Sequence, residues 1–342
     1  MINLGIVGLG RWGQRHVDAA IASGRFRVVR AVTPRPDRVA EFASIRSIAV
    51  SADVEDLFAD PLVDAVSLVT PNSLHARQIV RVASSGRHVL AEKPFALTRE
   101  DAEKAVEACV KAGIVVAVGH DNRFYPAIVE LKRLVDSGVL GKILHAEANI
   151  SHKGSREREM KAAVPSASAA WRRDRREAPA GSMIHVGIHR IDSYVQLFGK
   201  IDQLYAQASA DTPDTAFADS VSVLVQFRTG MTGYIASSQV TPLNSRMQVF
   251  GTQGWAEATG PHDFQEYARC SLKKIRVHRS DGTIEAREFD AIDSVRANLE
   301  AFADAIEGKS PYPIPPDELI HVVAVLEAVV TAIETGQPVL VS

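Results

Sequence analysis

The sequence predicts an α/β protein of two domains: an N-terminal, doubly wound parallel sheet and a C-terminal α+β domain with a large, mainly antiparallel open sheet. Three observations predict this fold class. Strand-like and helix-like segments alternate up to about residue 120, which is typical of β-α-β units with right-handed crossovers. After residue 143, short strand-like runs take over. A length of 342 residues exceeds one ordinary core, so we expect domains over residues 1–121 and 122–342.

The composition is that of a globular protein without a strong electrostatic preference. Hydrophobic residues make up 46% and charged residues 23%. The formal charge is −2, so we expect neither nucleic acid nor a membrane surface as a partner. The N-terminus has no basic segment before an apolar stretch, and we expect a cytoplasmic protein. Cys109 and Cys270 are too few for a disulfide framework and lack the spacing of a metal knuckle.

A glycine motif ends the first predicted strand. The apolar run NLGIVGLG, residues 3–10, leads into RWGQRHVDAAIASG, residues 11–24, which has helical spacing. Glycine at such a junction permits a tight turn, close approach of the backbone to a pyrophosphate, and close packing of helix on strand. The alternative is a glycine-rich turn without a ligand, but its position favours a dinucleotide-binding Rossmann domain. The candidate cofactor contacts here are Gly8, Gly10, Arg11, Trp12 and Gly13.

The end of the second predicted strand, residues 26–33, indicates which dinucleotide binds. An acidic residue at this tip would accept hydrogen bonds from both ribose hydroxyls and repel a 2′-phosphate. The tip instead carries Thr33 and Arg35, whose hydroxyl and guanidinium suit a phosphate, so NADP is favoured over NAD. Two alternatives stay open: a looped backbone could bring Asp37 back to the ribose, and Arg35 could be a solvated loop charge.

Polar residues follow the later strands of the first domain. Ligands of doubly wound sheets bind at the carboxyl ends of the strands, where these residues should cluster. Lys93 precedes Pro94, and because proline disfavours a helical conformation in the residue before it, Lys93 should be held extended at a strand tip. A surface role is the alternative for a lone lysine. The residues at these ends are Pro71, Asn72, His75, Glu92, Lys93 and His120.

Five motifs together resemble those of a known family. They are GLGRWG, TPNSLHA, AEKP, NRFYPAIVELKRLVDSGVLGKI and GSMIHVGIHRID. With them the chain closely resembles the glucose-fructose oxidoreductase and inositol dehydrogenase (Gfo/Idh/MocA) family of nicotinamide-dependent oxidoreductases over nearly its whole length. The resemblance implies a Rossmann domain, a C-terminal domain with a large open sheet, and catalysis by Lys93 and His189. Many members carry Asp where this sequence has His185.

The second domain shows a different pattern. Its strand-like runs include ILHAEANIS at residues 143–151 and SVSVLVQF at residues 220–227. One face of the resulting sheet should pack on helices. We expect the other face, lined by runs such as SVSVLVQF, to need a partner, which predicts a homodimer or homotetramer through this sheet. Residues 317–336 predict a long helix that ends at Gly336.

A helix beginning near Ser182 carries His185, His189 and Asp192 at helical spacing. Gly187, between the histidines, would leave room for a flat ring to approach. Zinc binding is one alternative, but H-x-x-x-H lacks the glutamate of H-E-x-x-H and an obvious third ligand, so we expect no metal. Two buried histidines without chemistry are another alternative. We favour proton transfer.

Hydride transfer requires a group that takes or gives the hydroxyl proton. Histidine has a suitable pKa without perturbation, so His189 is the candidate general acid/base. Lys93 would donate a hydrogen bond to the same oxygen and stabilise a developing alkoxide. His185 is the third candidate catalytic residue: if neutral it can only orient or relay, and if protonated it would depress the pKa of its neighbours.

Residues 153–178 contain six arginines around a loop of small residues. This excess could help to bind an acidic substrate such as a sugar acid, a carboxylated cyclic diol or a nucleotide sugar. A solvated loop is the alternative, because nearby acidic residues offset much of the charge. The candidate substrate-binding residues are Arg123, Trp171, Arg172 and Asp192.

The leading functional hypothesis is therefore a dehydrogenase or reductase that prefers NADP and acts on a sugar, a polyol or a cyclic diol. The alternative is a regulatory protein of the same fold that binds dinucleotide and sugar without turnover. His185 keeps this alternative open, whereas the presence of both Lys93 and His189 favours an enzyme.

Overall fold

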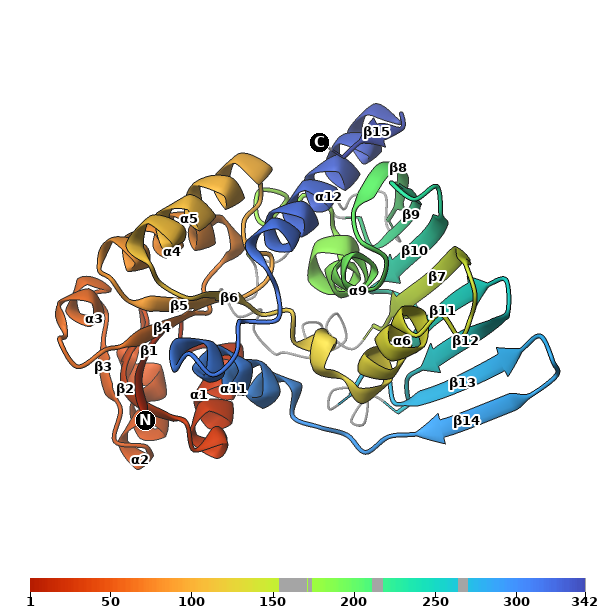
Figure 1. Ribbon diagram of the computed structural model, residues 1–342. Coiled ribbons are helices and arrows are strands. Elements are labelled where there is room, and N and C mark those ends of the chain that lie inside the picture. The colour runs from red at the N-terminus through yellow and green to blue at the C-terminus, as the bar shows by residue number, and fades with distance from the viewer. Residues whose placement is uncertain (154–170, 172–173, 211–217, 264–269, 342) are drawn as a thin grey trace. The chain divides into compact units, whose positions relative to one another are not determined.

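The computed structural model describes residues 1–153, 171, 174–210, 218–263 and 270–341 (Figure 1). The chain divides into two compact units. The first contains Met1–Asp121 and Val295–Val323, and the second contains Asn122–Ser294 and Ala324–Ser342. Residues Val295–Val323, which we expected in the second domain, thus belong to the first unit.

The first unit is built on a six-stranded parallel sheet. The strands follow the order β3-β2-β1-β4-β5-β6, which is the order of a doubly wound dinucleotide-binding sheet and confirms the predicted fold class. Their bounds are β1 (Ile2–Val7), β2 (Phe26–Val32), β3 (Ala49–Ser51), β4 (Ala65–Leu68), β5 (His88–Ala91) and β6 (Val116–Val118).

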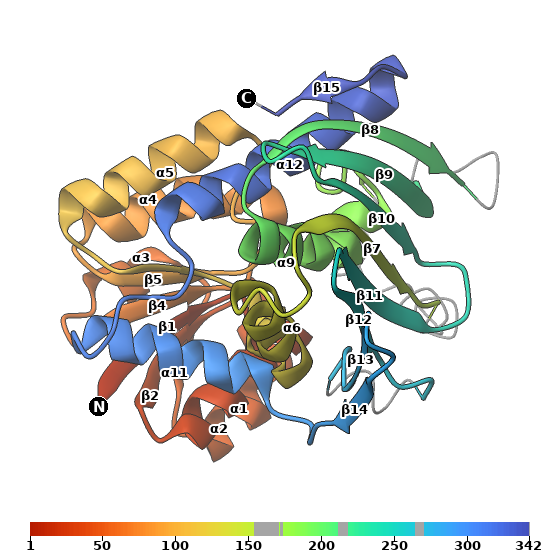
Figure 2. The same cartoon turned by 45° about the vertical axis from the view of Figure 1, so that its right-hand side comes forward.

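Helices cover both faces of this sheet (Figure 2). On one face, α3 (Glu55–Ala59), α4 (His75–Ser84) and α5 (Arg99–Ala112) pack in an apolar cluster with β4 and β5. On the other face, α1 (Arg11–Ser23), α2 (Ala40–Ile45) and α11 (Ser294–Ile306) pack against β1 and β2. Phe302 of α11 stacks on Phe26 of β2 with ring centroids 6.3 Å apart. This burial is the physical reason why a late segment of the chain belongs to the first unit.

The second unit is built on a nine-stranded sheet in the order β14-β13-β12-β11-β7-β10-β9-β8-β15. Among the described strands of this second sheet, β7 and β10 form the one parallel pair, so the sheet is mainly antiparallel, as predicted. The bounds are β7 (Ile143–Ser151), β8 (Ile201–Ser209), β9 (Ser220–Phe227), β10 (Thr232–Ser238), β11 (Asn244–Gly251), β12 (Gly254–Thr259), β13 (Lys274–Arg279), β14 (Ile284–Glu288) and β15 (Val339–Leu340).

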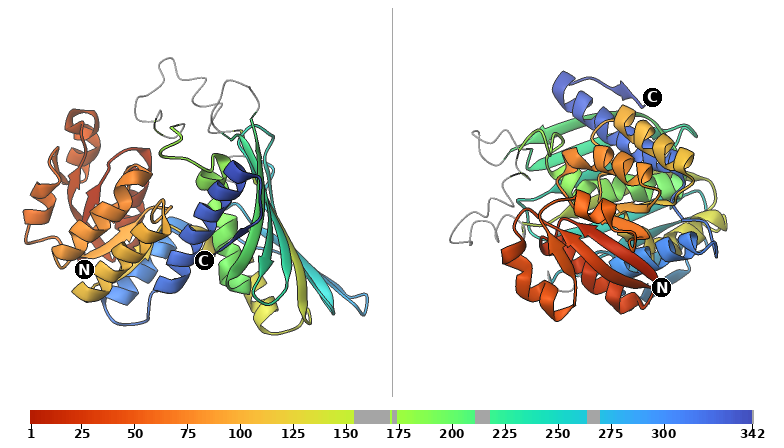
Figure 3. Two further views of the ribbon diagram at one scale, coloured as in Figure 1. Left: turned by 90° about the horizontal axis from the view of Figure 1, so that it is seen from above. Right: turned by 90° about the vertical axis from the view of Figure 1, so that its left-hand side faces the viewer.

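Helices lie on one face of this second sheet (Figure 3, left). They are α6 (Pro126–Asp136), the short π-helix η5 (Met183–Gly187), α9 (Ile188–Phe198) and the later part of α12 (Pro316–Thr335). The valines of SVSVLVQF do not line the outer face of the sheet: Val221, Val223 and Val225 are buried, and the exposed positions are Ser222, Leu224 and Gln226. Of the helices described, none has both the length and the hydropathy needed to cross a bilayer.

Candidate active site

The glycine loop between β1 and α1 has room for a ligand at one position. Gly8 has φ +98°, and a Cβ there would lie 2.2 Å from the Val69 carbonyl oxygen. A Cβ on Gly13 would lie 1.9 Å from the Gly8 carbonyl oxygen, so helix packing requires this glycine. A Cβ on Gly10 would meet nothing within 4 Å. The protein itself therefore requires Gly8 and Gly13, whereas Gly10 borders open space that a pyrophosphate could approach.

The N-terminus of α1 fits an anion. Its N-cap, Gly10, provides no side-chain hydrogen bond, and the first turn contains no acidic residue. The first amide N–H groups of the helix are thus left for a ligand, and the helix dipole favours negative charge there. Arg11 is exposed at the first helical position and makes no ion pair with the residues that the structure describes. These features fit the phosphates of a dinucleotide.

The tip of β2 carries the predicted ribose-side residues. The Thr33 amide N–H donates to the Ser51 carbonyl oxygen at 3.0 Å. Arg35 is the N-cap of a short 3-10 turn, Pro36–Val39, and is half-buried without an ion pair to any described residue. Asp37 lies inside that turn and is exposed. Arg35, without an acidic partner in the described chain, thus lies just beyond the carboxyl end of β2, where doubly wound sheets bind the ribose side of a dinucleotide.

His75 is committed to the protein itself. It begins α4, after the 3-10 turn Asn72–Leu74 that Pro71 caps, and its side chain is fully buried. Its Nδ1 lies 2.7 Å from the Pro94 carbonyl oxygen and its Nε2 lies 2.9 Å from the Thr70 carbonyl oxygen. The ring thus joins the loop after β4 to the loop after β5. We expected it as a cofactor contact, and it supports the loop instead of presenting a free nitrogen.

Glu92 and Lys93 directly follow β5, on the same edge of the sheet as the glycine loop. Glu92 is buried, and Lys93 is half-buried and joined to Pro94 by a cis peptide bond. The carboxylate of Glu92 accepts a hydrogen bond from His16 Nε2 at 3.0 Å and one from the Lys93 amide at 3.2 Å. His16 is not among the residues predicted above, although its position three residues after Gly13, in the helix that follows the glycine loop, is a signal that points to it. His120 follows β6 and is buried.

The two helix histidines lie at the change from π-helix to α-helix. His185 is in η5 and His189 is in the first turn of α9. Of residues 181–190, these two are the half-buried ones and the others are buried. A Cβ on Gly187 would lie 2.1 Å from Met183 Sδ and 3.1 Å from Ser237 Cβ. Close packing against the Met183 side chain and β10 therefore explains Gly187 better than access for a ring. Turns of π-helix are frequent at functional sites.

Arg123 and Asp192, both predicted to bind substrate, bind each other. Arg123 Nε lies 2.9 and 3.0 Å from the two Asp192 carboxylate oxygens, and Nη2 lies 2.7 Å from Oδ1. Their side chains are 4% and 0% exposed. This ion pair ties the start of the second unit to α9, and its burial gives it a structural role.

The arginine-rich loop is only partly described. Arg172 lies outside the described residues, whereas Trp171 lies within them in a short turn. Arg175 pairs with Glu334 at 2.8 Å and Arg176 pairs with Asp174 at 2.6 Å, all of them at least partly exposed. Two of the arginines thus have acidic partners, which agrees with the solvated-loop alternative for this part of the segment.

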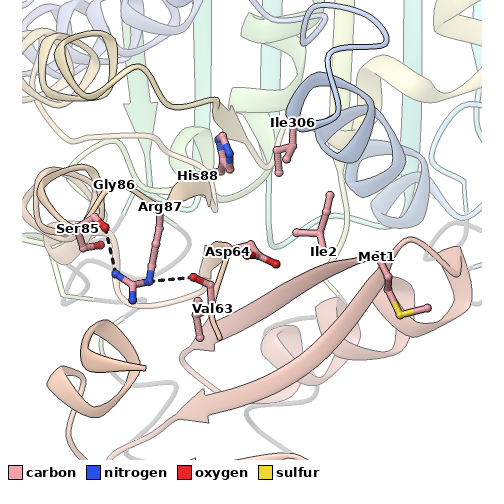
Figure 4. A pocket seen from close by; sticks show the side chains of 9 residues that line it. All are labelled: Met1, Ile2, Val63, Asp64, Ser85, Gly86, Arg87, His88 and Ile306. Atoms are coloured by element: carbon pink, nitrogen blue, oxygen red, sulfur yellow. Dashed lines mark hydrogen bonds between the residues drawn. The ribbon is translucent and has the colours of Figure 1, made fainter. Parts of the chain in front are cut away.

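Two other features, grouped metal ligands and a pocket at the opposite edge of the first sheet, give no sign of a second functional site in the described residues. Over the described parts of the chain, no three His, Cys, Asp or Glu side chains gather as metal ligands would. Figure 4 shows the pocket, which lies at the amino ends of β1, β4 and β5. Its Arg87 donates to the carbonyl oxygens of Val63 and Ser85, and Nδ1 of its His88 accepts the Val115 amide. These polar groups hold the loops together.

Comparisons with known proteins cover both units. The description "Oxidoreductase family, NAD-binding Rossmann fold" matches residues 2–120, and "GFO/IDH/MocA C-terminal domain" matches residues 128–257. D-xylose 1-dehydrogenase (NADP(+)) 2 of Haloferax volcanii is 27% identical over 336 residues, covering 98% of each chain. The 1,5-anhydro-D-fructose reductase of Ensifer adhaerens is 27% identical over 347 residues, covering 97% of this chain and 96% of that protein.

A solved structure extends the likeness to three dimensions. The aldose-aldose oxidoreductase from Caulobacter crescentus, complexed with glycerol, has a TM-score of 0.84 and 25% sequence identity, and the match covers 99% of each chain. The two family matches together span more than half of the 342 residues. The chain therefore belongs to the Gfo/Idh/MocA family of oxidoreductases, whose N-terminal domain has the NAD-binding Rossmann fold.

Proposed function

We propose that this protein is a dehydrogenase or reductase that prefers NADP and acts on a secondary alcohol or the corresponding ketone of a sugar, a polyol or a cyclic diol. The observation that carries the proposal is the position of Lys93. It follows β5, on the sheet edge where Gly10 borders open space at the N-terminus of α1. A cation at this edge suits an oxygen that becomes negative during the reaction.

In this proposal, Lys93 and His189 both interact with the substrate oxygen. A bound nicotinamide supplies the acceptor or donor of hydride. Lys93, as an ammonium, donates a hydrogen bond to the substrate oxygen and stabilises alkoxide character. His189 takes the hydroxyl proton during oxidation and returns it during reduction. His185 orients His189 or relays its proton. Because Lys93 belongs to the first unit and His189 to the second, their meeting at one oxygen stays a prediction.

The preference for NADP rests on Arg35. Its guanidinium lacks an acidic partner in the described chain, and the tip of β2 has no acidic residue before Asp37. NADP is also the cofactor that the name of the Haloferax volcanii relative gives.

The substrate class rests on the relatives. The curated relatives reported above are named for D-xylose and for 1,5-anhydro-D-fructose, and another relative is named for scyllo-inositol. Polyhydroxylated rings or chains with one oxidisable carbon are common to these names. An acidic substituent on such a substrate remains part of the proposal because of the arginines in residues 153–178.

A spectrophotometric screen tests the function. Purified protein is mixed with NADP or NAD and a panel of aldoses, inositols and sugar acids, and with the reduced cofactors and ketone counterparts. We expect a change at the absorbance band of reduced nicotinamide, larger with the NADP pair. Lys93→Ala and His189→Ala should each lower kcat by at least about a hundredfold. Near wild-type turnover of either variant would remove that residue from the proposal.

The second candidate function is a regulatory protein that binds dinucleotide and sugar without turnover. The observation that favours it is His185, which cannot supply the fixed negative charge of an aspartate. The same screen separates the two functions. Tight binding of NADP and a sugar by calorimetry, with no absorbance change for any substrate in either direction, would support regulation.

We also propose a homodimer or homotetramer through the outer face of the second sheet. Leu224 is 56% exposed on that face. Tyr205 and Tyr234 on the neighbouring strands β8 and β10, and Trp255 farther along the sheet on β12, are only half-buried. Aromatic residues of this kind are enriched in protein interfaces. Light scattering should give a multiple of 37.0 kDa, and Leu224→Asp should lower it towards the monomer mass.

A further inference from the structure

A buried polar network runs from α1 to the residue that we propose to be catalytic. His16 of α1 is 2% exposed. Its Nδ1 lies 2.9 Å from Ser67 Oγ of β4, and its Nε2 lies 3.0 Å from Glu92 Oε1 after β5. Ser67 is fully buried within the sheet, so the network is not a hydrolytic triad: no substrate could reach that hydroxyl. The function described so far does not use these groups.

The direction of each hydrogen bond follows from the chemistry of the groups. An ionised carboxylate only accepts, so His16 Nε2 must donate to Glu92. Burial raises the pKa of Glu92, but the hydrogen bond and charge of His16, followed by the charge of Lys93, outweigh it and lower the pKa to about 2. The Ser67 hydroxyl donates to Nδ1 when the ring is neutral and accepts when it is charged. The network is therefore satisfied in both states of the ring.

The carboxylate of Glu92 has little freedom to move. Its Oε2 accepts the amide N–H of Lys93 at 3.2 Å while Oε1 is held by His16. On the side of β6, a Cβ on Gly119 would lie 2.5 Å from Oε1, so the backbone of that strand end packs directly on the carboxylate. Trp12, one turn before His16 on α1, places its ring 6.3 Å from the imidazole. Elements on three sides thus fix the carboxylate.

We propose that His16 is a positioning residue for Lys93, acting through Glu92. By holding one carboxylate oxygen, His16 aims the other at the backbone of Lys93 and keeps a negative charge beside the ammonium. The charged or titratable groups at this carboxylate are His16 from α1 and Lys93 from the loop after β5. Gly119 after β6 adds no charge, and the neutral Ser67 of β4 contacts His16 on the far side of its ring. The inference rests on the proposed role of Lys93 in the reaction. It explains why a histidine is buried behind a cofactor loop.

Three variants test the proposal by turnover and by its pH dependence. His16→Leu removes the donor to Glu92, whereas His16→Gln retains an amide N–H of similar reach. In wild type, turnover should fall at high pH because Lys93 loses its proton, and we call this part of the pH profile the high-pH limb. We expect His16→Leu and Glu92→Gln to lower kcat about tenfold or more, with cofactor KM changed less than about threefold, and to move this limb about one pH unit lower. His16→Gln should restore the wild-type limb.

A matched control measures the general effect of losing a histidine in this unit. His88 lies at the start of β5, at the opposite end of the strand from Glu92, and is half-buried. We expect His88→Leu to keep the wild-type pH limb. Thermal denaturation of every variant shows whether it folds. If His16→Leu does not fold, Glu92→Gln and His16→Gln still decide the matter, because the proposal requires opposite effects from them.

An assay without turnover separates this inference from the proposed function. Lysine side chains labelled with 13C are titrated by NMR in the protein without substrate, and Lys93→Arg assigns the Lys93 signal. We expect Lys93 to lose its proton at lower pH in His16→Leu than in wild type. If this shift occurs but Lys93→Ala retains turnover, the inference survives as a charge effect and the proposed catalytic role fails. An unchanged titration and an unchanged pH limb in His16→Leu would overturn the inference.

Discussion

Arg123 and Asp192 form a buried ion pair in the second unit, with three N···O distances between 2.7 and 3.0 Å. Arg123 comes from the turn before α6, and Asp192 lies on α9, one turn after His189. Because the guanidinium fork meets the carboxylate along one edge, the pair fixes the rotation of α9 about its axis. The half-buried His189, one turn away, lies on the stretch of helix that this pair holds.

Asp192→Ala should strongly destabilise the protein, because it leaves the Arg123 guanidinium buried without its counter-charge. Loss of one partner of a buried pair costs about 3–5 kcal/mol. Urea unfolding followed by circular dichroism measures the effect. As a control, Glu103→Ala breaks the exposed pair with Arg99 and should cost less than about 1 kcal/mol. The double variant Arg123→Met/Asp192→Leu should recover part of the loss, and equal losses for the single and double variants would contradict this account.

Gly10→Ala should weaken cofactor binding without changing stability much, whereas Gly13→Ala should lower stability. A Cβ on Gly10 meets open space, so Gly10→Ala should fold with nearly wild-type stability and bind NADP at least about tenfold more weakly. A Cβ on Gly13 meets the Gly8 carbonyl, so Gly13→Ala should cost at least about 1–3 kcal/mol of unfolding free energy. Calorimetric titration and urea unfolding measure the two quantities. Unchanged NADP affinity in Gly10→Ala would refute the assignment of the loop.

Local sequence patterns predicted much of the fold. β7 and β9 have the bounds of the runs ILHAEANIS and SVSVLVQF, because alternation with a period of two directly reflects a half-buried strand. The glycine loop was also predictable from a local pattern, because its three glycines lie directly between the strand and the helix in the sequence. The long C-terminal helix was also predicted, and it ends before Gly336, which has φ +65°.

What the patterns could not predict depends on partners far apart in the chain. The apolar residues of α11 indicate a buried face but do not say against which sheet it packs. Arg123 and Asp192 are 69 residues apart, and His16 and Glu92 are 76 apart, so no local spacing connects them. The π-helical turn at Met183–Gly187 was not indicated by the sequence, because its side-chain spacing fits an ordinary α-helix equally well.

Arg35→Ala should change the cofactor preference. Loss of a charge-assisted contact to the 2′-phosphate costs about 1.5–3 kcal/mol, so kcat/KM with NADP should fall about 10- to 100-fold while the value with NAD changes little. Initial rates with both cofactors give the ratio. Arg27→Ala is the matched control, because Arg27 is exposed at the opposite end of the same strand. An equal loss with NADP and NAD would show that Arg35 does not read the phosphate.

His75→Phe should destabilise the first unit, although the two side chains are similar in shape. Both ring nitrogens of His75 face carbonyl oxygens, at 2.7 and 2.9 Å, and a carbonyl can only accept. The variant leaves the carbonyl oxygen to which the ring donates without that donor and should lose about 1–3 kcal/mol. His145→Phe, at a more exposed position of β7, is the control. Equal unfolding free energies for His75→Phe and wild type would contradict this account.

Glu92 should make stability depend on pH in the acidic range. Its pKa in the folded protein is about 2 against an ordinary value of 4.5, so the folded state binds the proton less readily than the unfolded state does. Its contribution is therefore fully present above about pH 5 and is lost as the pH falls towards 2, with an upper limit of about 3 kcal/mol. Urea unfolding at several pH values should show the gap between wild type and Glu92→Gln shrinking from pH 6 to pH 3. Glu107→Gln, at an exposed position of α5, is the control for removing a surface carboxylate. Because the low pKa of Glu92 depends on His16, the difference in unfolding free energy between wild type and His16→Leu should also shrink as the pH falls. If this difference stays constant with pH for both His16→Leu and Glu92→Gln, the partners of Glu92 do not lower its pKa on folding.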